Sequence, residues 1–551
     1  MATETATQRA AETGFALVAD SIAETAAAYG ARYAFGIPGN DVLELVRACE
    51  EHGIEFVLAK SEPAAGFMAD VVYQLTGKPA VLIPAMGPGV GNIMAGIGNA
   101  LMEHSAVLVL SGDIGSDEAG IYNHQVFDHV ELMRPLVKHA DQLNPHRAAQ
   151  QTARALDIAM RYPAGPVLLN CPADFSRAEA KQLPVYAPAE ISNSNLTEAA
   201  AEEIRAMLAK AERPLALIGL GSLHADVPAP LTRFLESWGI PFLASYKAKG
   251  VVDEHNALSL GAAGLSPVID GENFKLFDHA DLIVMVGFDP IELRNAWIDA
   301  WPEDKTALTV DWAEQTHRIF PVGRQALGDV PTILGQITSA EARECGWPRD
   351  RLDSHRAAIA HIVRPRSPDV GISPAALFQE VSDRLTEDWI LTVDVGAHRI
   401  LACHAIHCRA PGQLIQTNGF CSMGYAIPAA IGAGLVAKDK PIVALVGDGC
   451  TLMSIGELAL AAERDMPLVI VVLNDAALAL IKLKQSKMQM DRRAVDFANP
   501  KYDKIAEGFG AIGVRVETVE DFATALDEAV ARRKLTVIDA AIDPAEYWEQ
   551  M

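Results

Sequence analysis

Two short polar turns near the end of the chain, each containing an aspartate, give the clearest indication of a functional site. We call them the acidic corners. An apolar run at 441–446 stops at Gly447-Asp448-Gly449, and a second apolar run at 467–473 ends at Asn474-Asp475. Two buried parallel strands that flank a helix would bring both corners to the same carboxyl-end edge of a sheet. The 27 residues from Asp448 to Asp475 are enough for one strand–helix–strand crossover. Carboxylates there suit Mg²⁺ together with phosphate oxygens, so we expect a metal–diphosphate site. For Gly-Asp-Gly alone, a chance turn is the alternative.

Two segments in the first part of the chain place polar or flexible residues at expected helix starts. Glu62 follows a strand and opens the helix expected at 64–76, where favourable helix-dipole electrostatics would by themselves explain an acid. Gly87 to Asn92 is a glycine-rich loop before a helix, as in phosphate cradles. It lacks a Walker lysine and the Rossmann spacing, and a packing turn is the alternative.

The elements that must position these residues form three α/β segments. Strands alternate with helices, which predicts an α/β fold of three doubly wound parallel-sheet domains. The expected divisions are a disordered tail at 1–12 and domains at 13–180, 196–345 and 373–545, separated by a Pro- and Ser/Asn-rich linker and a charged connector. The expected strands are 33–36, 55–58, 80–84, 107–111, 165–170, 215–218, 241–244, 282–286, 306–310, 390–393, 414–416, 441–446, 467–473 and 536–542.

Composition excludes several classes of partner. The 551 residues are half apolar and carry a net charge of −25, which argues against nucleic-acid and anionic-membrane partners. No apolar run is long enough to span a membrane, and the polar N-terminus lacks a signal core, so we expect a cytoplasmic protein. Seven scattered cysteines argue against a disulfide framework or a zinc site.

Many separate stretches, in order, resemble the thiamine diphosphate (ThDP) enzymes of the acetohydroxyacid/acetolactate synthase family. The resemblance covers about residues 13–545 and is closest to the catabolic branch, which lacks FAD. The matching stretches are Phe35-Gly36-Ile37-Pro38-Gly39, Glu62 to Asp70 with Thr76 to Pro79, Gly87-Pro88-Gly89, His124-Gln125 with Asp128, Gly287 to Glu292, Asp394-Val395-Gly396 with His398, Met423-Gly424, the Gly-Asp-Gly unit, Ile481-Lys482 and Asn499-Pro500.

The resemblance implies a ThDP pyrimidine-binding domain, a central domain and a diphosphate- and Mg²⁺-binding domain, in that order. Asp448 and Asp475 would bind Mg²⁺, with the carbonyl of Ala477 as a third ligand. The residues implied near the cofactor's diphosphate are Gly396, Ala397, His398, Gly449 and Cys450. The alternative for His398 is a core histidine whose hydrogen bonds are satisfied within the protein.

The resemblance also implies how the reaction is started. Glu62 would hydrogen-bond the aminopyrimidine ring, the carbonyl of Cys421 would accept from its amino group, and Met423 would force the cofactor into a V shape. For Met423, a plain core methionine is the alternative. His124 and Gln125 would lie near the reacting atoms, although His124 alone fits a surface loop. A 2-oxo acid would lose CO₂ to leave an enamine, which a second carbonyl compound could trap.

The expected substrate pocket departs from the catabolic relatives. Asp41 stands where they usually have lysine, and Leu478 and Leu483 replace a tyrosine and a tryptophan. These changes suggest a differently shaped, more aliphatic pocket, which puts acetolactate synthesis itself in doubt but not ThDP chemistry. The residues expected to line it are Asn40, Asp41, Leu478, Ile481 and Leu483.

Three functions stay open on these residues. The first is a ThDP carboligase acting on a 2-oxo acid, with a second 2-oxo acid or an aldehyde as acceptor. The second is a ThDP-dependent decarboxylase or C–C lyase without carboligation, and the third is a non-catalytic homologue. The resemblance implies a homodimer or homotetramer with active sites between subunits. FAD is not expected, and Gly219-Leu220-Gly221-Ser222 is only half of a dinucleotide loop.

Overall fold

The structure is a computed structural model that describes residues 16–180, 185–189, 195–302, 305–315, 317, 319–368 and 370–551. The tail expected at 1–12 and most of the first linker lie outside the described residues. The chain divides into two compact units. One contains residues 1–191, 419–439 and 453–466, and the other contains residues 192–418, 440–452 and 467–551.

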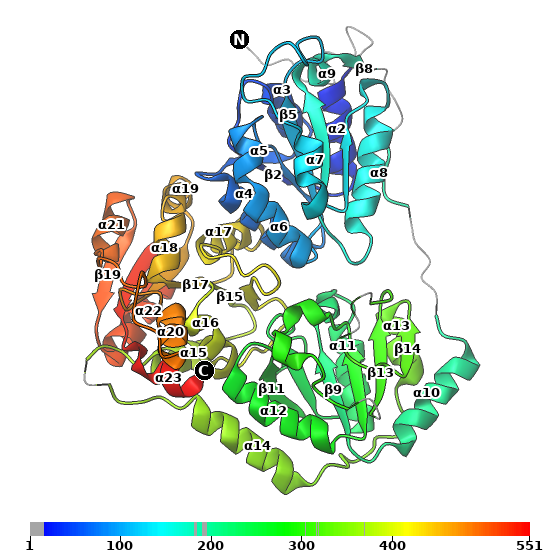
Figure 1. The fold of residues 1–551 in the computed structure, drawn as a ribbon, viewed down its shortest axis with the longest axis vertical. Coiled ribbons are helices and arrows are strands. Elements are labelled where there is room, and N and C mark those ends of the chain that lie inside the picture. Colours follow the sequence, from blue (N-terminus) through cyan, green and yellow to red (C-terminus); the bar gives the residue numbers. More distant parts are fainter. Residues whose placement is uncertain are drawn as a thin grey trace. The chain divides into compact units, whose positions relative to one another are not determined.

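Three six-stranded sheets, each entirely parallel, form the framework (Figure 1). The first has the order β3-β2-β4-β5-β7-β6. Its strands are β2 (Tyr33–Gly36), β3 (Glu55–Leu58), β4 (Ala80–Leu82), β5 (Val107–Asp113), β6 (His139–Gln142) and β7 (Val167–Pro172). Its helices are α2 (Val18–Ala28), α3 (Leu43–Glu51), α4 (Glu62–Thr76), α5 (Pro88–Asn92), α6 (Met94–Met102), α7 (His129–Met133), α8 (Ala148–Met160) and α9 (Ala173–Arg177). A two-stranded antiparallel pair, β1 (Ala16–Leu17) with β8 (Glu179–Ala180), joins the two ends of this part.

The second sheet has the order β11-β10-β9-β12-β13-β14. Its strands are β9 (Pro214–Ile218), β10 (Phe242–Ser245), β11 (Ser259–Ala263), β12 (Leu282–Val286), β13 (Thr306–Asp311) and β14 (Arg324–Leu327). Its helices are α10 (Glu198–Lys210), α11 (Pro228–Trp238), α12 (Pro267–His279), α13 (Val330–Ile337) and α14 (Arg349–Ile362). This order doubles back at β9 and β12, as in dinucleotide-binding folds.

The third sheet has the order β16-β15-β17-β18-β20-β19. Its strands are β15 (Ile390–Val393), β16 (Leu414–Gln416), β17 (Ile442–Gly447), β18 (Leu468–Asn474), β19 (Ile512–Val516) and β20 (Thr536–Ala541). The helices along this stretch of the chain are α15 (Pro374–Arg384), α16 (Ala397–Ala405), α17 (Ala426–Val436), α18 (Asp448–Ser454), α19 (Glu457–Glu463), α20 (Ala479–Lys487), α21 (Tyr502–Gly508), α22 (Val519–Arg532) and α23 (Tyr547–Gln550). The expected class, three doubly wound parallel-sheet domains, is confirmed.

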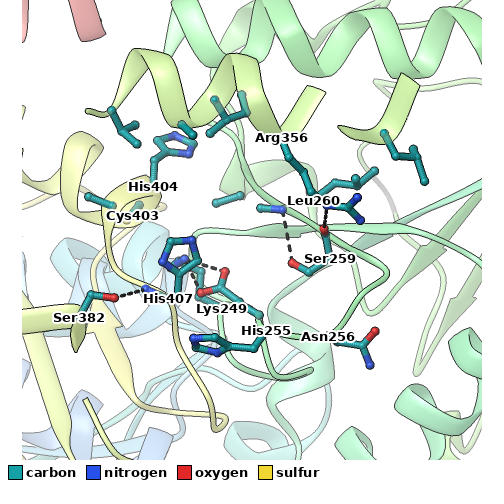
Figure 2. A pocket seen from close by; sticks show the side chains of 18 of the residues that line it. Lys249, His255, Asn256, Ser259, Leu260, Arg356, Ser382, Cys403, His404 and His407 are labelled. Carbon is teal, nitrogen blue, oxygen red and sulfur yellow. Dashed lines mark hydrogen bonds and ion pairs between the residues drawn. The ribbon is translucent and has the colours of Figure 1, made fainter. Parts of the chain in front are cut away.

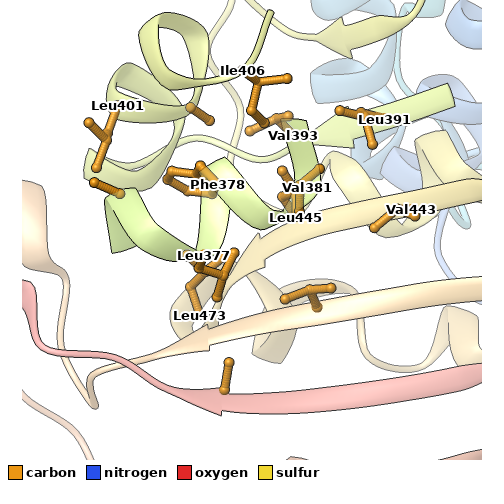
Figure 3. Close-up of a cluster of buried hydrophobic side chains, with 14 of the residues drawn as sticks. Leu377, Phe378, Val381, Leu391, Val393, Leu401, Ile406, Val443, Leu445 and Leu473 are labelled. Atoms are coloured by element: carbon orange, nitrogen blue, oxygen red, sulfur yellow. The ribbon is translucent and has the colours of Figure 1, made fainter. Parts of the chain in front are cut away.

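Alternate residues of the third sheet build one face of its core (Figure 3). Leu391 and Val393 on β15, and Val443 and Leu445 on β17, are buried on that face, because side chains along a strand alternate between faces. Phe378 of α15 packs against them. Burying each of these large side chains contributes about 1.5–3 kcal/mol. The core therefore holds the strand ends that carry Asp448 and Asp475 in a fixed register.

Helices α17 and α19 belong to the same compact unit as the first sheet. Helix α17 packs along α4, and the hydroxyl of Tyr425, just before α17, donates to Asp70 of α4 at 2.8 Å. At the start of α19, Glu457 accepts from the backbone N–H of Lys60 at 3.1 Å. These contacts fix the position of the segment just before Glu62. Within the described residues, no helix is both long enough and apolar enough to cross a bilayer.

Candidate functional site

The two acidic corners meet at the carboxyl end of β17 and β18. Gly447 lies opposite Leu473 in the ladder, so both strands end at the same edge. The backbone N–H of Asp475 donates to Asp448 Oδ2 at 3.1 Å, and that of Gly449 donates to Asp448 Oδ1 at 2.7 Å. The juxtaposition predicted from the spacing is therefore present in the structure.

Burial makes this carboxylate pair costly without a cation. Burial raises the pKa of Asp448 to about 6 against the opposing effect of backbone N–H donors. Burial and the charge of Asp448 raise the pKa of Asp475 to about 7, although Lys482 acts in the opposite direction. Asp475 Oδ2 is buried and has no hydrogen-bond partner. A divalent cation would satisfy that oxygen and offset the repulsion between the two carboxylates.

Side chains alone do not complete a metal shell here. In the described part of the chain, no group of three His, Cys, Asp or Glu side chains could hold a metal ion. A cation at Asp448 and Asp475 would need a backbone carbonyl and ligand oxygens besides. That donor set suits Mg²⁺, which commonly combines one or two carboxylates with phosphate oxygens.

Helix α16 begins beside the acidic corner, at Gly396, Ala397 and His398. A Cβ on Gly396 would lie 2.6 Å from His398 Nδ1, and one on Gly447 would lie 3.0 Å from His398 Cε1. Burial, followed by the charge of Arg399, lowers the pKa of His398 to about 3, so the imidazole is neutral. Its Nε2 is buried without a partner. The imidazole therefore lies against two glycines, and it keeps one buried nitrogen, Nε2, without a partner.

Cys450 and Ala477 lie on the two segments that follow the corners. Cys450 is buried in α18, and its thiol donates to the carbonyl of Val395 at 3.2 Å. Ala477 is buried next to Ala476, whose φ is +54°, and forms an isolated β-bridge with Asp496. A helix thus holds Cys450, whereas a tight backbone turn shapes the segment at Ala477.

Helix α20 follows this turn and presents the residues expected at the substrate. Leu478 precedes the helix and donates its N–H to the carbonyl of Val495 at 2.7 Å. Ile481 is 42% exposed, whereas Leu483 is only 4% exposed and belongs to the hydrophobic core of the third sheet. The two positions therefore meet different surroundings, and Leu483 has a packing role as well.

A polar network behind Asp475 was not anticipated from the sequence. The side-chain amide of Asn474 donates to Asn499 Oδ1 and to Asp539 Oδ1, both at 2.8 Å. Arg515 donates to the same Asp539 oxygen at 2.8 Å. Because these residues come from β18, β19, β20 and a loop, only the fold reveals that they fix the Asn474-Asp475 corner. The only sequence signal for this network is Asn499-Pro500, one of the stretches that resemble the ThDP enzymes.

Glu62 begins α4 in the other compact unit. The carboxylate of Glu457 holds the preceding segment by accepting from the Lys60 N–H and from the Ser61 hydroxyl at 3.3 Å. The side-chain amide of Asn92 approaches Glu62 Oε2 at 3.4 Å. Glu62 is half-buried, so a ligand could reach its carboxylate.

The side chain of Asp41 lies against the carboxyl end of β5 in the first sheet. Its Oδ2 accepts from the backbone N–H of Met86 at 2.8 Å. A Cβ on Gly112 would lie 1.7 Å from this oxygen, so only glycine leaves room for the carboxylate. The neighbouring Asn40 accepts from Arg177 through its carbonyl at 3.2 Å. Asp41 is therefore tied to the segment that leads into Gly87.

His124 and Gln125 lie on an exposed loop between β5 and α7. Gln125 has a φ of +61°, and a Cβ on Gly87 would meet the Cβ of Gln125 at 2.7 Å. The nearby His129, which the sequence did not predict, is buried, and its Nδ1 lies 3.1 Å from Asn170 Oδ1. The loop is thus packed against the glycine turn, while both predicted side chains remain exposed.

Cys421 and Met423 lie just before α17, in the same unit as Glu62. Both are half-buried, and Cys421 has a φ of +55°. The start of the segment is held by the Gly419 N–H, which donates to Glu103 Oε1 at 2.9 Å. The positive φ of Cys421 thus gives its backbone a defined orientation in this turn.

A cavity of about 960 Å³ lies elsewhere in the second unit, between the edge strand β11 with α14 and the helices α15 and α16 (Figure 2). Lys249 and Glu254 lie in its wall as a buried ion pair, with Lys249 Nζ 2.6 Å from Glu254 Oε1. Burial would lower the pKa of Lys249, but the charge of Glu254 raises it above its usual value. Glu254 also accepts from the Cys408 N–H at 2.6 Å. These charges satisfy one another and so act structurally.

Replacing Glu254 by glutamine should therefore destabilise the protein by about 3–5 kcal/mol, because Lys249 would stay buried without its counter-charge. The exposed pair Lys275–Glu272 is the matched control, and Glu272→Gln should cost no more than about 1 kcal/mol. Chemical unfolding of the two variants compares the losses. Equal losses would contradict a structural role for the buried pair.

In the central sheet, the strand order reverses between β9 and β12, and side chains of the protein itself occupy the space at this point. Glu292 is buried there and accepts from the backbone N–H of Leu220 at 2.9 Å and from the Ser245 hydroxyl. A Cβ on Gly219 would lie 2.4 Å from the Cα of Phe288. Burial raises the pKa of Glu292 to about 8. A protein carboxyl thus takes the N–H that a nucleotide phosphate would use in a dinucleotide fold.

Fold and site together define the class, an α/β enzyme with a carboxylate corner suited to a metal and a diphosphate. Residues 17–132, 201–337 and 394–540 match the N-terminal TPP binding domain, the central domain and the C-terminal TPP binding domain of the thiamine pyrophosphate enzymes. The acetolactate synthase of Bacillus subtilis is 28% identical, over 96% of this chain and 93% of its own length. Acetolactate synthase isozyme 1 large subunit of Escherichia coli is 29% identical, over 94% and 92% respectively.

The chain therefore belongs to the thiamine pyrophosphate enzymes, and it is a ThDP-dependent enzyme of the acetolactate synthase-like type. A probable acetolactate synthase large subunit of Methanocaldococcus jannaschii extends the similarity, with 26% identity over 96% of this chain and 92% of the relative.

Proposed function

We propose that the protein is a ThDP- and Mg²⁺-dependent carboligase that acts on a 2-oxo acid. The observation that carries the proposal is the buried pair Asp448–Asp475 at the carboxyl end of β17 and β18, within a ThDP family chain. When bound, the cofactor supplies the carbanion chemistry, while the protein supplies orientation and electrostatics.

Asp448 and Asp475 hold Mg²⁺ in this proposal, with the carbonyl of Ala477 as the third protein ligand. The unpartnered Asp475 Oδ2 supports this assignment. The diphosphate is contacted by Gly396, Ala397, His398, Gly449 and Cys450. The glycines at the start of α16 and end of β17, and the unused Nε2 of His398, fit such a polar group.

Glu62 binds the aminopyrimidine ring of the cofactor, the carbonyl of Cys421 accepts from its amino group, and Met423 supports its bend. The half-buried Glu62 carboxylate and the φ of +55° at Cys421 support these roles. His124 and Gln125 act near the reacting atoms, where their exposure leaves them free to contact a substrate. A closed site that excludes water would favour the loss of charge when CO₂ leaves.

The substrate pocket in this proposal includes Asn40, Asp41, Leu478, Ile481 and Leu483. The exposed Ile481 supports a contact with substrate. The Asp41 carboxylate is engaged by the Met86 N–H, so it shapes the pocket more than it pairs with a ligand.

The remaining parts of the proposal concern partners and location. We propose a cytoplasmic homodimer or homotetramer in which Glu62 of one subunit serves with Asp448 of another. Several relatives are named as large subunits, which agrees with assembly into a multimer. FAD is not expected, and the Glu292 carboxyl at the Leu220 N–H supports this expectation.

Supplying pyruvate with ThDP and Mg²⁺ tests the reaction. We expect a carboligated product, scored as acetolactate, to exceed acetaldehyde. Excess acetaldehyde would favour the alternative, a ThDP-dependent decarboxylase or C–C lyase without carboligation. If neither forms, a panel of 2-oxo acids and aldehydes identifies the substrate. Failure to bind ThDP and Mg²⁺ at all would instead indicate a non-catalytic homologue.

A further inference from the structure

A chain of hydrogen bonds crosses the carboxyl end of the first sheet and ends at the Gly87 turn. The Asn170 amide on β7 donates from Nδ2 to Asp113 Oδ2 at 2.5 Å, and its Oδ1 accepts from the Ser111 hydroxyl at 2.8 Å. His129 Nδ1 lies 3.1 Å from the same Asn170 oxygen. His129 Nε2 lies 3.4 Å from the backbone nitrogen of Gly87. His129 and Asn170 are almost fully buried, so water competes little for these contacts.

The partners of His129 determine which of its two nitrogens carries the proton. The Asp113 carboxylate only accepts, so the Asn170 amide turns Nδ2 towards it and Oδ1 towards His129. Because Oδ1 is an acceptor, His129 Nδ1 must carry the proton and donate it. Nε2 is then an acceptor, and it faces the backbone N–H of Gly87, which only donates. The contacts on both sides of the imidazole therefore select one neutral tautomer.

The Gly87 turn packs against the loop that carries His124 and Gln125. Gly87 has a φ of +69°, and a Cβ there would lie 2.7 Å from both the Cβ and the carbonyl oxygen of Gln125. The His129 ring also packs edge-to-face against Phe127, with the ring centroids 4.7 Å apart. The imidazole thus contacts the turn through Nε2 and the end of the loop through its ring, so the loop is held at two points.

The turn leaves the sheet at the same edge as Glu62. Strands β3 and β4 both pair in parallel with β2, so the segments that follow them, with Glu62 and Gly87, start at the carboxyl edge. Helix α5 begins directly after Gly87 and ends at Asn92, whose side-chain amide approaches Glu62 Oε2 at 3.4 Å. One short helix therefore separates the Gly87 turn from the carboxylate that we propose to bind the cofactor.

We propose that His129 is a positioning residue of the active site: its imidazole fixes the Gly87 turn, and the turn holds Gln125 where it can meet the reacting atoms. The inference rests on the function proposed above, in which His124 and Gln125 act near those atoms. His129 is itself buried, so it acts through Gln125 and not on the substrate. Since a misplacement of about 1 Å can cost about 10²-fold in rate, loosening of this turn should be visible in turnover.

Two conservative variants separate the two contacts of the imidazole. Glutamine can place an oxygen near the position of Nε2 and keep an acceptor for the Gly87 N–H, whereas asparagine can place an amide nitrogen near Nδ1 and keep only the donor to Asn170. His129→Leu removes both. With ThDP and Mg²⁺, His129→Leu and His129→Asn should lower kcat for 2-oxo acid consumption by about 10- to 100-fold, and His129→Gln should recover most of this loss. The affinity for ThDP should change much less than kcat in all three variants.

A double-mutant cycle tests whether His129 acts through Gln125. Gln125→Ala alone should lower kcat, and adding His129→Asn should lower it little further, because the two changes remove the same contribution. Losses that multiply, or full activity in Gln125→Ala, would overturn the proposal. The control is His146→Asn, which changes an exposed histidine between β6 and α8 and should leave kcat unchanged.

Hydrogen exchange of the cofactor-free protein gives a measure that does not depend on turnover. In His129→Asn and His129→Leu, backbone N–H groups of residues 84–92 and 121–128 should exchange about 10-fold faster than in the wild type, while peptides from the second and third sheets keep their rates. His129→Gln should stay close to the wild type. Chemical unfolding of the same variants measures global stability. If kcat followed global stability, with His129→Gln no better than His129→Asn, the role would be merely structural and the proposal would be overturned.

The two proposals can fail separately. If the wild type converts no 2-oxo acid, the carboligase function fails, while faster exchange confined to residues 84–92 and 121–128 would still support the anchoring of the loop by His129. If the wild type forms acetolactate but His129→Asn keeps full kcat, His129 has no positioning role and the carboligase function stands.

Discussion

Replacing Glu62 by glutamine is expected to lower kcat for 2-oxo acid consumption by about 10²- to 10⁴-fold. Glutamine keeps the shape of the side chain but cannot take or hold a proton, and a positioned acid–base group typically contributes this factor. Steady-state assays at saturating ThDP and Mg²⁺ measure the loss. The cofactor affinity should fall less than kcat, because most binding contacts would be unchanged.

The control for this prediction is Glu24→Gln, which changes an exposed carboxylate on α2. It should leave kcat unchanged. A second comparison is Glu457→Gln, which loosens the Lys60–Ser61 segment without removing the Glu62 carboxylate. It should lower kcat by less than Glu62→Gln. Full activity in Glu62→Gln would refute the role that we assign to this residue.

Replacing Asp475 by asparagine should weaken Mg²⁺-dependent binding of ThDP by at least about 100-fold, since even residues that only support metal ligands cost 10- to 100-fold. The amide keeps the size of the side chain but removes the negative charge beside Asp448. Calorimetric titration of ThDP with and without Mg²⁺ measures the change. Asp491→Asn, on an exposed loop of the same unit, should leave the affinity unaltered. An unchanged Mg²⁺ requirement in Asp475→Asn would place the metal elsewhere.

The same pair predicts a pH dependence of the cofactor-free protein. The pKa of Asp448 is raised to about 6 and that of Asp475 to about 7, both from an ordinary value of 3.8. Between pH of about 4 and about 7 the folded state therefore binds more protons than the unfolded state, and their contribution to stability falls as pH rises. Mg²⁺ with ThDP should raise the melting temperature more at pH of about 7.5 than at about 5.5. In Asp475→Asn this difference should shrink; a difference as large as in the wild type would show that other groups cause it.

The central strands of each sheet could be predicted from the sequence because they are buried on both faces and read as apolar runs. The expected runs at 282–286 and 390–393 coincide with β12 and β15. In the three six-stranded sheets, the four strands that were missed, β6, β11, β14 and β19, all lie at sheet edges; the short pair β1–β8 was missed as well. Three of them are partly exposed, with sequences such as HADQ and RQAL that carry no apolar run. An edge strand is specified mainly by its neighbour, which a sequence pattern does not show.

The candidate site likewise has a part that the sequence predicts and a part that it does not. The spacing of Asp448 and Asp475 was enough to predict that they meet, because one crossover fixes where both strands end. The partners of Asn474 were not predictable, since Asp539 and Arg515 reach it from distant strands.

The close approach of Asp41 to Gly112 limits which side chain position 41 can carry. The carboxylate accepts the Met86 N–H in a space that only a glycine at 112 leaves free. A lysine at position 41 would remove that acceptor and bring a longer side chain into the same space. Asp41 and Gly112 therefore depend on each other, and Asp41→Lys alone should be unfavourable. A different residue at position 41 would therefore require compensating changes elsewhere in the same turn.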